Sequence, residues 1–197
     1  MVIPALYLNL QKVVIASSMP GFSSLLSAST LALFLRGAVA TEPSVSALAA
    51  CSAISATGIE TLGEVTDALN PKFIDAQSHY WSAANADLYP ACAVFPTSVE
   101  EVSQIVTILQ NSSGVNFAVK SGGHNPNVGY SSTDGGVLIS MSSISSTIIS
   151  SDRKTADVGP GARWVQVAEA LDPYGVTVVS GRLGEQRTPS RSRSKRF

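Results

Sequence analysis

The feature that most constrains the fold of this chain is a strand, a helix and a second strand in direct succession between residues 91 and 120. The apolar run 91–95 and the segment 117–120 have the composition of short strands. Between them, Ser98 and Glu101 have the spacing of a capping box at the start of a helix. Its apolar face is predicted to comprise Val99, Val102, Ile105, Val106 and Leu109. Such a βαβ unit makes its strands parallel and leaves the next loop at their carboxyl end, where ligands bind.

Further elements are predicted on both sides of this unit. In chain order they are a helix over 61–70 that Pro71 stops, a strand over 137–141, a β meander through 148–149 and 156–158 with its turn at Asp152, a helix that Gly175 ends, and a strand over 176–179. The buried face of the second helix is predicted to comprise Trp164, Val167, Ala168 and Leu171. At 197 residues, this pattern predicts one α+β fold with a small mixed sheet and flanking helices.

The loop over residues 121–130 carries the side chains best suited to chemistry. Gly122 and Gly123 let the backbone approach a phosphate and point successive N–H groups at it, although two glycines taken alone more often form a plain tight turn. His124 follows them and can act as a nucleophile toward an electrophilic cofactor carbon; the alternative is a histidine in a surface turn. The chain has only two histidines and no second ligand in register, so no metal site is predicted.

Several blocks of sequence around this loop occur in an order found in a known family. They are Lys120–Asn127, Gly129-Tyr130, Asp134–Val137, the upstream Pro90–Val102, and the downstream Val158–Trp164 and Val179–Arg182. Together they resemble the FAD-linked oxidases related to vanillyl-alcohol oxidase and berberine bridge enzyme, closest to the 6-hydroxy-D-nicotine oxidase type and to fungal secreted members. The resemblance covers about residues 80–184 and implies the amino-terminal part of a PCMH-type FAD-binding domain.

The resemblance also implies roles for individual residues. In that family the loop histidine is bonded to the 8α-methyl carbon of the flavin, and the matching residue here is His124. The pyrophosphate and ribityl path would be lined by Ser121, Gly122, Gly123, Asn125, Gly129 and Tyr130. For Lys120 two positions remain open, beside phosphate charge or at the end of a strand in solvent. FAD is therefore the expected cofactor.

The amino-terminal segment and the cysteines indicate secretion. Within residues 1–40, apolar stretches lead to Ala38-Val39-Ala40, a small-residue cleavage site; a membrane anchor, the alternative, would need about 18 uninterrupted apolar residues. Cys51 and Cys92 form an even pair and predict a disulfide, with two free buried thiols as the alternative. Their placement is similar to that of an amino-terminal disulfide in secreted members of the resembled family. The sequon at Asn111 predicts glycosylation.

The end of the chain departs from the resembled family. Family members continue into the rest of the FAD site, a substrate domain and the usual catalytic base, whereas residues 185–197 form an Arg/Ser tail predicted to be disordered. The domain prediction is therefore a targeting segment over 1–40, an extension over 41–79, a partial FAD-binding domain over 80–184 and the tail, in a truncated chain. The alternative is a genuine tail that binds RNA. Outside residues 182–197, seven basic residues stand against thirteen acidic ones, so no nucleic-acid partner is predicted.

Three functional hypotheses follow. The first is an FAD-dependent oxidoreductase that oxidises an alcohol, a sugar or a secondary metabolite and returns electrons to oxygen, with its catalytic residue unassigned. The second is a truncated, non-catalytic secreted fragment of such an enzyme. The third, a Rossmann dinucleotide enzyme, is weak because no Gly-x-Gly-x-x-Gly follows a strand and Pro160 stiffens the turn at 159–161.

Overall fold

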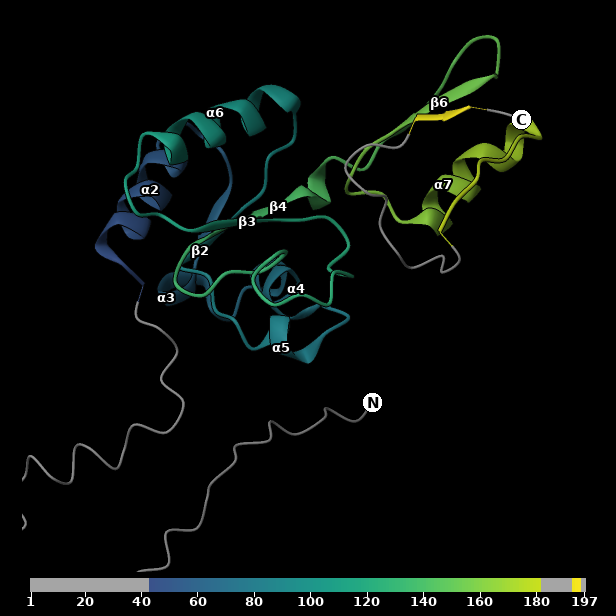
Figure 1. The fold of residues 1–197 in the computed structure, drawn as a ribbon. Coiled ribbons are helices and arrows are strands. Elements are labelled where there is room, and N and C mark those ends of the chain that lie inside the picture. Colours follow the sequence, from purple (N-terminus) through teal and green to yellow (C-terminus); the bar gives the residue numbers. More distant parts are fainter. Residues whose placement is uncertain (1–42, 182–192, 196–197) are drawn as a thin grey trace, which may run out of the picture. The chain divides into compact units, whose positions relative to one another are not determined.

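A computed structural model describes residues 43–181 and 193–195 of the chain (Figure 1). In chain order the elements are α2 (Val45–Ser55), β1 (Thr61–Gly63), α3 (Glu64–Asp67), α4 (Pro71–Ser78), α5 (Ala83–Ala86), β2 (Cys92–Val94), α6 (Val99–Gln110), β3 (Phe117–Lys120), β4 (Val137–Ser140), the 3-10 helix η1 (Met141–Ser143), β5 (Thr147–Ile149), β6 (Thr155–Val158), α7 (Trp164–Leu171), the 3-10 helix η2 (Asp172–Tyr174) and β7 (Arg193–Lys195). The predicted signal over residues 1–40 lies outside the described residues.

A four-stranded mixed sheet in the order β1-β2-β4-β3 forms the centre of the fold. β1 is antiparallel to β2, whereas β2 and β3 both pair in parallel with β4, which lies between them. The predicted βαβ unit is thus confirmed, with β4 inserted between its two strands. Because β2, β4 and β3 run in one direction, their carboxyl ends meet at the same edge of the sheet, and the loop 121–130 begins there.

Helices cover both faces of this sheet (Figure 1). Alternate strand residues point to opposite faces, so each strand contributes to two cores. One face packs against α2 and α6, through a core that includes Ala50, Ile54, Val94, Ile105, Leu109, Val137 and Ile139. The other face packs against α4, through Phe73, Ala76, Ala93, Phe95, Ala118 and Leu138. This arrangement explains why β2 and β4 are apolar at nearly every position, as buried parallel strands are.

A three-stranded antiparallel sheet, in the order β5-β6-β7, lies beyond η1 in the sequence. The predicted meander is β5 and β6, and α7 adds Trp164, Val167 and Leu171 to a third core. Three residues of the Arg/Ser tail form β7 on β6; the rest of the tail lies outside the described residues, and the domain boundaries stay predictions.

The strand predicted over 176–179 is wrong. Val176 and Val178 do pack against the α7 core, so the apolar alternation is real. In the described residues β6 pairs with β5 and β7, and the segment 176–179 joins no ladder. Alternation of burial therefore arose here without strand pairing.

The helix predicted over 61–70 is also wrong. Residues 61–63 form β1 against β2, and the helical turn α3 is only four residues long. Pro71 begins α4 instead of only ending what precedes it, because a missing N–H costs nothing at the first helical position. Asn70 caps this helix by accepting a hydrogen bond from the Lys72 N–H at 3.0 Å.

The two predicted amphipathic helices are confirmed, with errors at their margins. In α6, Val99 is 74% exposed and Ile108 packs against the core, because the buried stripe centres on Ile105 and Leu109. Ser98 caps α6 as predicted, but the Glu101 carboxylate accepts from the N–H of Thr97, one residue before the cap. In α7, Ala168 is exposed.

The disulfide is confirmed between Cys51 of α2 and Cys92 of β2, with 6.2 Å between their Cα atoms. It ties the first described helix to a central strand of the sheet. Among the described residues, no helix has both the length and the apolar character needed to cross a membrane.

Candidate functional site

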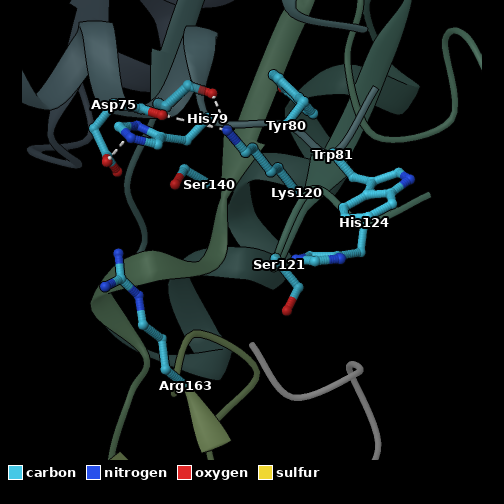
Figure 2. A pocket seen from close by; sticks show the side chains of 11 residues that line it. Asp75, His79, Tyr80, Trp81, Lys120, Ser121, His124, Ser140 and Arg163 are labelled. Atoms are coloured by element: carbon cyan, nitrogen blue, oxygen red, sulfur yellow. Dashed lines mark hydrogen bonds and ion pairs between the residues drawn. The ribbon is translucent and has the colours of Figure 1, made fainter. Parts of the chain in front are cut away.

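A cavity of about 260 Å³ opens at the carboxyl ends of β3 and β4 (Figure 2). It is lined by Asp75, Ala76, His79, Tyr80, Trp81, Lys120, Ser121, Gly122, His124, Ser140 and Arg163. These residues come from the end of α4, the segment after it, the end of β3, the loop 121–124, the end of β4 and the residue before α7. The cavity is therefore assembled from segments that are far apart in the sequence.

The structure brings together part of the predicted site. Ser121, Gly122 and His124 line the cavity, whereas Gly123 is buried behind it and Asn125, Gly129 and Tyr130 are outside the lining. The imidazole of His124 stacks on the indole of Trp81, with 5.8 Å between ring centroids and 23° between planes (Figure 2). The predicted nucleophile thus lies at the cavity, against an aromatic ring that is 69% exposed.

Gly123 is the position where the loop requires glycine. Its φ of +67° lies in the left-handed region, and an added Cβ would lie 2.7 Å from the His79 carbonyl oxygen. The Gly123 carbonyl in turn accepts a hydrogen bond from the Trp81 N–H at 2.9 Å. The second glycine therefore lets the loop lie directly against the segment 79–81.

We expect Gly123→Ala to lower the free energy of unfolding by about 2–3 kcal/mol, because backbone strain and a clash with a main-chain oxygen add together. Gly114→Ala is the matched control, since Gly114 has a φ of +74° and no atom within 4 Å of an added Cβ. This control measures the cost of placing alanine in the left-handed backbone conformation without a clash, which we expect to be about 1 kcal/mol. Urea denaturation measures the free energy of unfolding of both variants. Equal losses in Gly123→Ala and Gly114→Ala would contradict the close contact between residue 123 and the His79 carbonyl oxygen.

Of the two positions that the sequence left open for Lys120, the structure excludes the one in solvent. Its side chain is only 5% exposed, so it does not end in solvent. The ammonium donates hydrogen bonds to the carbonyls of Asp75, at 3.3 Å, and Ala76, at 2.5 Å, in the last turns of α4. It also lies 3.7 Å from the centroid of the Tyr80 ring. A cation at a helix carboxyl end and over an aromatic face is doubly stabilised, and it adds positive charge to the cavity wall.

Burial raises the pKa of Tyr80 to about 12 from an ordinary 10.0, while the Ser132 hydroxyl opposes this shift. The phenol donates a hydrogen bond to the Ser131 carbonyl at 3.0 Å. As pH rises, the unfolded chain loses the Tyr80 proton before the folded chain does. The contribution of Tyr80 to the free energy of unfolding is therefore fully present below about pH 10 and is lost as pH rises toward 12, by about 3 kcal/mol in total.

The expected result is a fall in unfolding free energy between pH 10 and 12 that is smaller in Tyr80→Phe. Absorbance at the tyrosinate band provides a second readout, in which the difference between the wild-type chain and Tyr80→Phe should appear only near pH 12. Identical pH dependence in the two proteins would contradict the assignment.

Sequence reasoning did not assign several residues of the cavity. His79 Nδ1 lies 2.9 Å from the Asp75 carboxylate, Arg163 precedes α7, and Ser140 ends β4. The Ser121 hydroxyl donates to the Pro160 carbonyl, which joins the loop to the turn before α7. Arg163 lies within the block 158–164 that resembles the FAD-linked oxidases, and this resemblance was the only indication in the sequence that Arg163 belongs to the site. Nothing in the sequence connected His79 to the loop.

The cavity has the chemistry of a nucleotide-cofactor site. The first glycine of the Gly-Gly turn, two serine hydroxyls, the Tyr80 phenol and two cationic side chains line it at the carboxyl ends of parallel strands. It is smaller than the roughly 300–1,000 Å³ typical of a complete small-molecule site, so these residues fit one portion of a cofactor as large as FAD. The fold and the site are therefore those of an α+β unit with the features expected of a nucleotide-cofactor site.

Known proteins agree with this class. Residues 90–185 match the family described as FAD binding domain. An uncharacterized FAD-linked oxidoreductase of Arthroderma benhamiae is 38% identical over 135 residues, which are 68% of this chain and 26% of that protein. The FAD-dependent monooxygenase macF of Penicillium terrestre is 45% identical over 103 residues, 52% of this chain and 20% of that protein. This chain thus spans about a quarter or less of the length of these relatives.

Solved structures show the same fold. Physcomitrella patens BBE-like 1 gives a TM-score of 0.58 at 24% identity, covering 70% of this chain and 29% of that one. 6-Hydroxy-D-nicotine oxidase from Arthrobacter nicotinovorans gives 0.55 at 23% identity, covering 66% and 27%. Residues 90–185 accordingly match an FAD binding domain, and their fold is shared with the berberine bridge enzyme-like and 6-hydroxy-D-nicotine oxidase structures. The predicted PCMH-type fold, with a mixed sheet and flanking helices, is confirmed.

Proposed function

We propose that this chain binds FAD at the cavity through a covalent bond to His124, as part of a secreted FAD-dependent oxidoreductase. The observation that carries the proposal is the position of the His124 imidazole, at the cavity and directly after a Gly-Gly turn. An imidazole nitrogen of His124 would replace one hydrogen of the flavin 8α-methyl group, and the two electrons and two protons released would pass to oxygen, the second reactant of the proposal. FAD, when bound, supplies the hydride acceptor of the reaction.

The residues around the cavity have separate roles in this proposal. The backbone of Ser121 and Gly122 faces the cofactor phosphates, and Arg163 and Lys120 supply positive charge at the wall. Lys120 acts through its charge, because its ammonium is hydrogen bonded to the end of α4. Trp81 orients the imidazole of His124 by stacking on it. Asn125, Gly129 and Tyr130 would meet FAD farther along the loop.

Relatives support the reaction class and the covalent bond. A solved structure of glucooligosaccharide oxidase from Acremonium strictum, with a TM-score of 0.58 at 22% identity, concerns a 6-S-cysteinyl, 8α-N1-histidyl FAD. Several relatives are called FAD-dependent monooxygenases, and one solved neighbour is a chitooligosaccharide oxidase. The substrate class we propose is accordingly an alcohol, a sugar or a secondary metabolite, with oxygen as the second reactant.

Secretion is supported by two features of the described residues. Cys51 and Cys92 form a disulfide, which persists in oxidising compartments. Asn111 is exposed at the end of α6, where a glycan would have room.

The test is to express the full chain in a secreting host and to precipitate it with acid. Flavin absorbance that remains with the precipitated protein is the expected result, since a noncovalent flavin stays in solution. Protein that carries flavin in its native state and releases it in acid would refute the covalent bond alone. Folded protein without any flavin would refute the whole proposal.

A further inference from the structure

Asn85, on the short helix α5, is a fully buried polar side chain near the loop, with an exposed fraction of 0%. Its amide nitrogen donates to the carbonyls of Asn125 and Asn127, at 3.0 and 3.3 Å. Its amide oxygen accepts a hydrogen bond from the Gly129 N–H at 3.2 Å. One side chain therefore binds the backbone at three alternate positions, beginning with the residue after His124.

This loop segment has little else of its own to hold it. The side chains of residues 126–130 are exposed, and Gly129 has a φ of +83° with open space around it. A local turn contributes, because the Asn127 N–H donates to the Asn125 side chain at 3.0 Å. Buried polar groups are costly unless they are paired, so the three bonds to Asn85 determine the backbone path that leaves His124.

We propose that Asn85 is the positioning residue of the flavin loop: it holds residues 125–129 so that the imidazole of His124 faces the cavity in the orientation needed for bonding to the cofactor. Asn85 does not line the cavity and touches no reacting atom, so it acts through the loop. The inference rests on the proposed function for its catalytic consequence, but the hydrogen bonds themselves can be tested without flavin.

The test compares Asn85→Ala and Asn85→Asp in the full chain by amide hydrogen exchange and acid-stable flavin. In Asn85→Ala we expect the Gly129 amide to exchange about tenfold faster or more, and acid-stable flavin per folded protein to fall by a similar factor. Asn85→Asp keeps the acceptor for Gly129 and loses the donors to Asn125 and Asn127. Slow exchange at Gly129 together with reduced flavin is expected for this variant.

Gln77→Ala is the matched control. Gln77 donates to the carbonyls of Ala86, at 2.6 Å, and Leu88, at 3.5 Å, so it supports the carboxyl end of α5, and among the described residues its hydrogen bonds do not reach the loop. The control should leave Gly129 exchange and flavin content unchanged in the folded protein. If Asn85→Ala does not fold, the comparison of Asn85→Asp with Gln77→Ala still shows whether the Asn85 amide nitrogen is needed for flavin attachment.

Each outcome bears on the inference. Unchanged Gly129 exchange in folded Asn85→Ala would overturn it, as would equal flavin loss in Gln77→Ala and Asn85→Asp. A wild-type chain that carries no flavin would refute the proposed function, while the exchange data would still decide whether Asn85 holds the loop.

Discussion

A His124→Ala variant of the full chain is expected to contain no acid-stable flavin, whereas the wild-type chain retains it. The reason is chemical: methyl replaces the only imidazole that the loop places at the cavity, and the Ser121 hydroxyl beside it is a much weaker nucleophile. The measurement is the flavin absorbance of acid-precipitated, washed and redissolved protein, normalised to protein content.

His79→Ala is the matched control for this loss. His79 is the other histidine of the chain, and it also lines the cavity, but its Nδ1 is engaged with Asp75 of α4, the helix that His79 follows. The control should retain acid-stable flavin. Loss in His79→Ala with retention in His124→Ala would move the attachment site from the loop to the end of α4. Loss in both would point to a general effect on the cavity.

Removing the disulfide is expected to lower the free energy of unfolding by about 4 kcal/mol, the value that chain entropy gives for cysteines 41 residues apart. The double variant Cys51→Ala, Cys92→Ala is preferable to serine, since both sites are buried and a hydroxyl would lack a partner there. The crosslink joins α2 to the strand β2, so α2 is the element expected to detach first. Chemical denaturation followed by circular dichroism measures the loss.

A reducing agent supplies the control for the disulfide. It should destabilise the wild-type chain by an amount similar to that of the double variant, and it should leave the variant unchanged. If the reduced wild-type chain remained as stable as the oxidised one, the crosslink would contribute nothing to stability and the chain-entropy estimate would not apply to this fold.

The sequence was informative where local chemistry and regular spacing coincide. Ser98 predicts the start of α6 because a side-chain oxygen can satisfy an unpaired N–H of the first turn, and the structure shows that bond. The strands β3 and β4 could be predicted because apolar runs bounded by turn residues have few other uses. Gly122, Gly123 and His124 drew attention because glycine and imidazole in one loop have a specific chemistry.

The errors occurred where the partner of a segment determines its structure. Residues 61–63 became a strand because β2 offered an edge to pair with, and residues 176–179 stayed outside the sheets although their apolar side chains alternate. Local propensity cannot reveal whether a strand edge is available, since that depends on segments distant in the sequence.

The chain's own residues, read in order, were enough to indicate a phosphate-type loop with a histidine, the paired cysteines and the parallel strands that present the loop, and the resemblance to a known family indicated FAD. They did not reveal that Trp81 stacks on His124, that Lys120 caps the end of α4, or that Asn85 holds residues 125–129 from 40 positions away. These contacts join segments separated by tens of residues, and folding alone brings them within hydrogen-bonding distance. A motif is a property of neighbouring residues, whereas a binding site is a property of the whole packed fold.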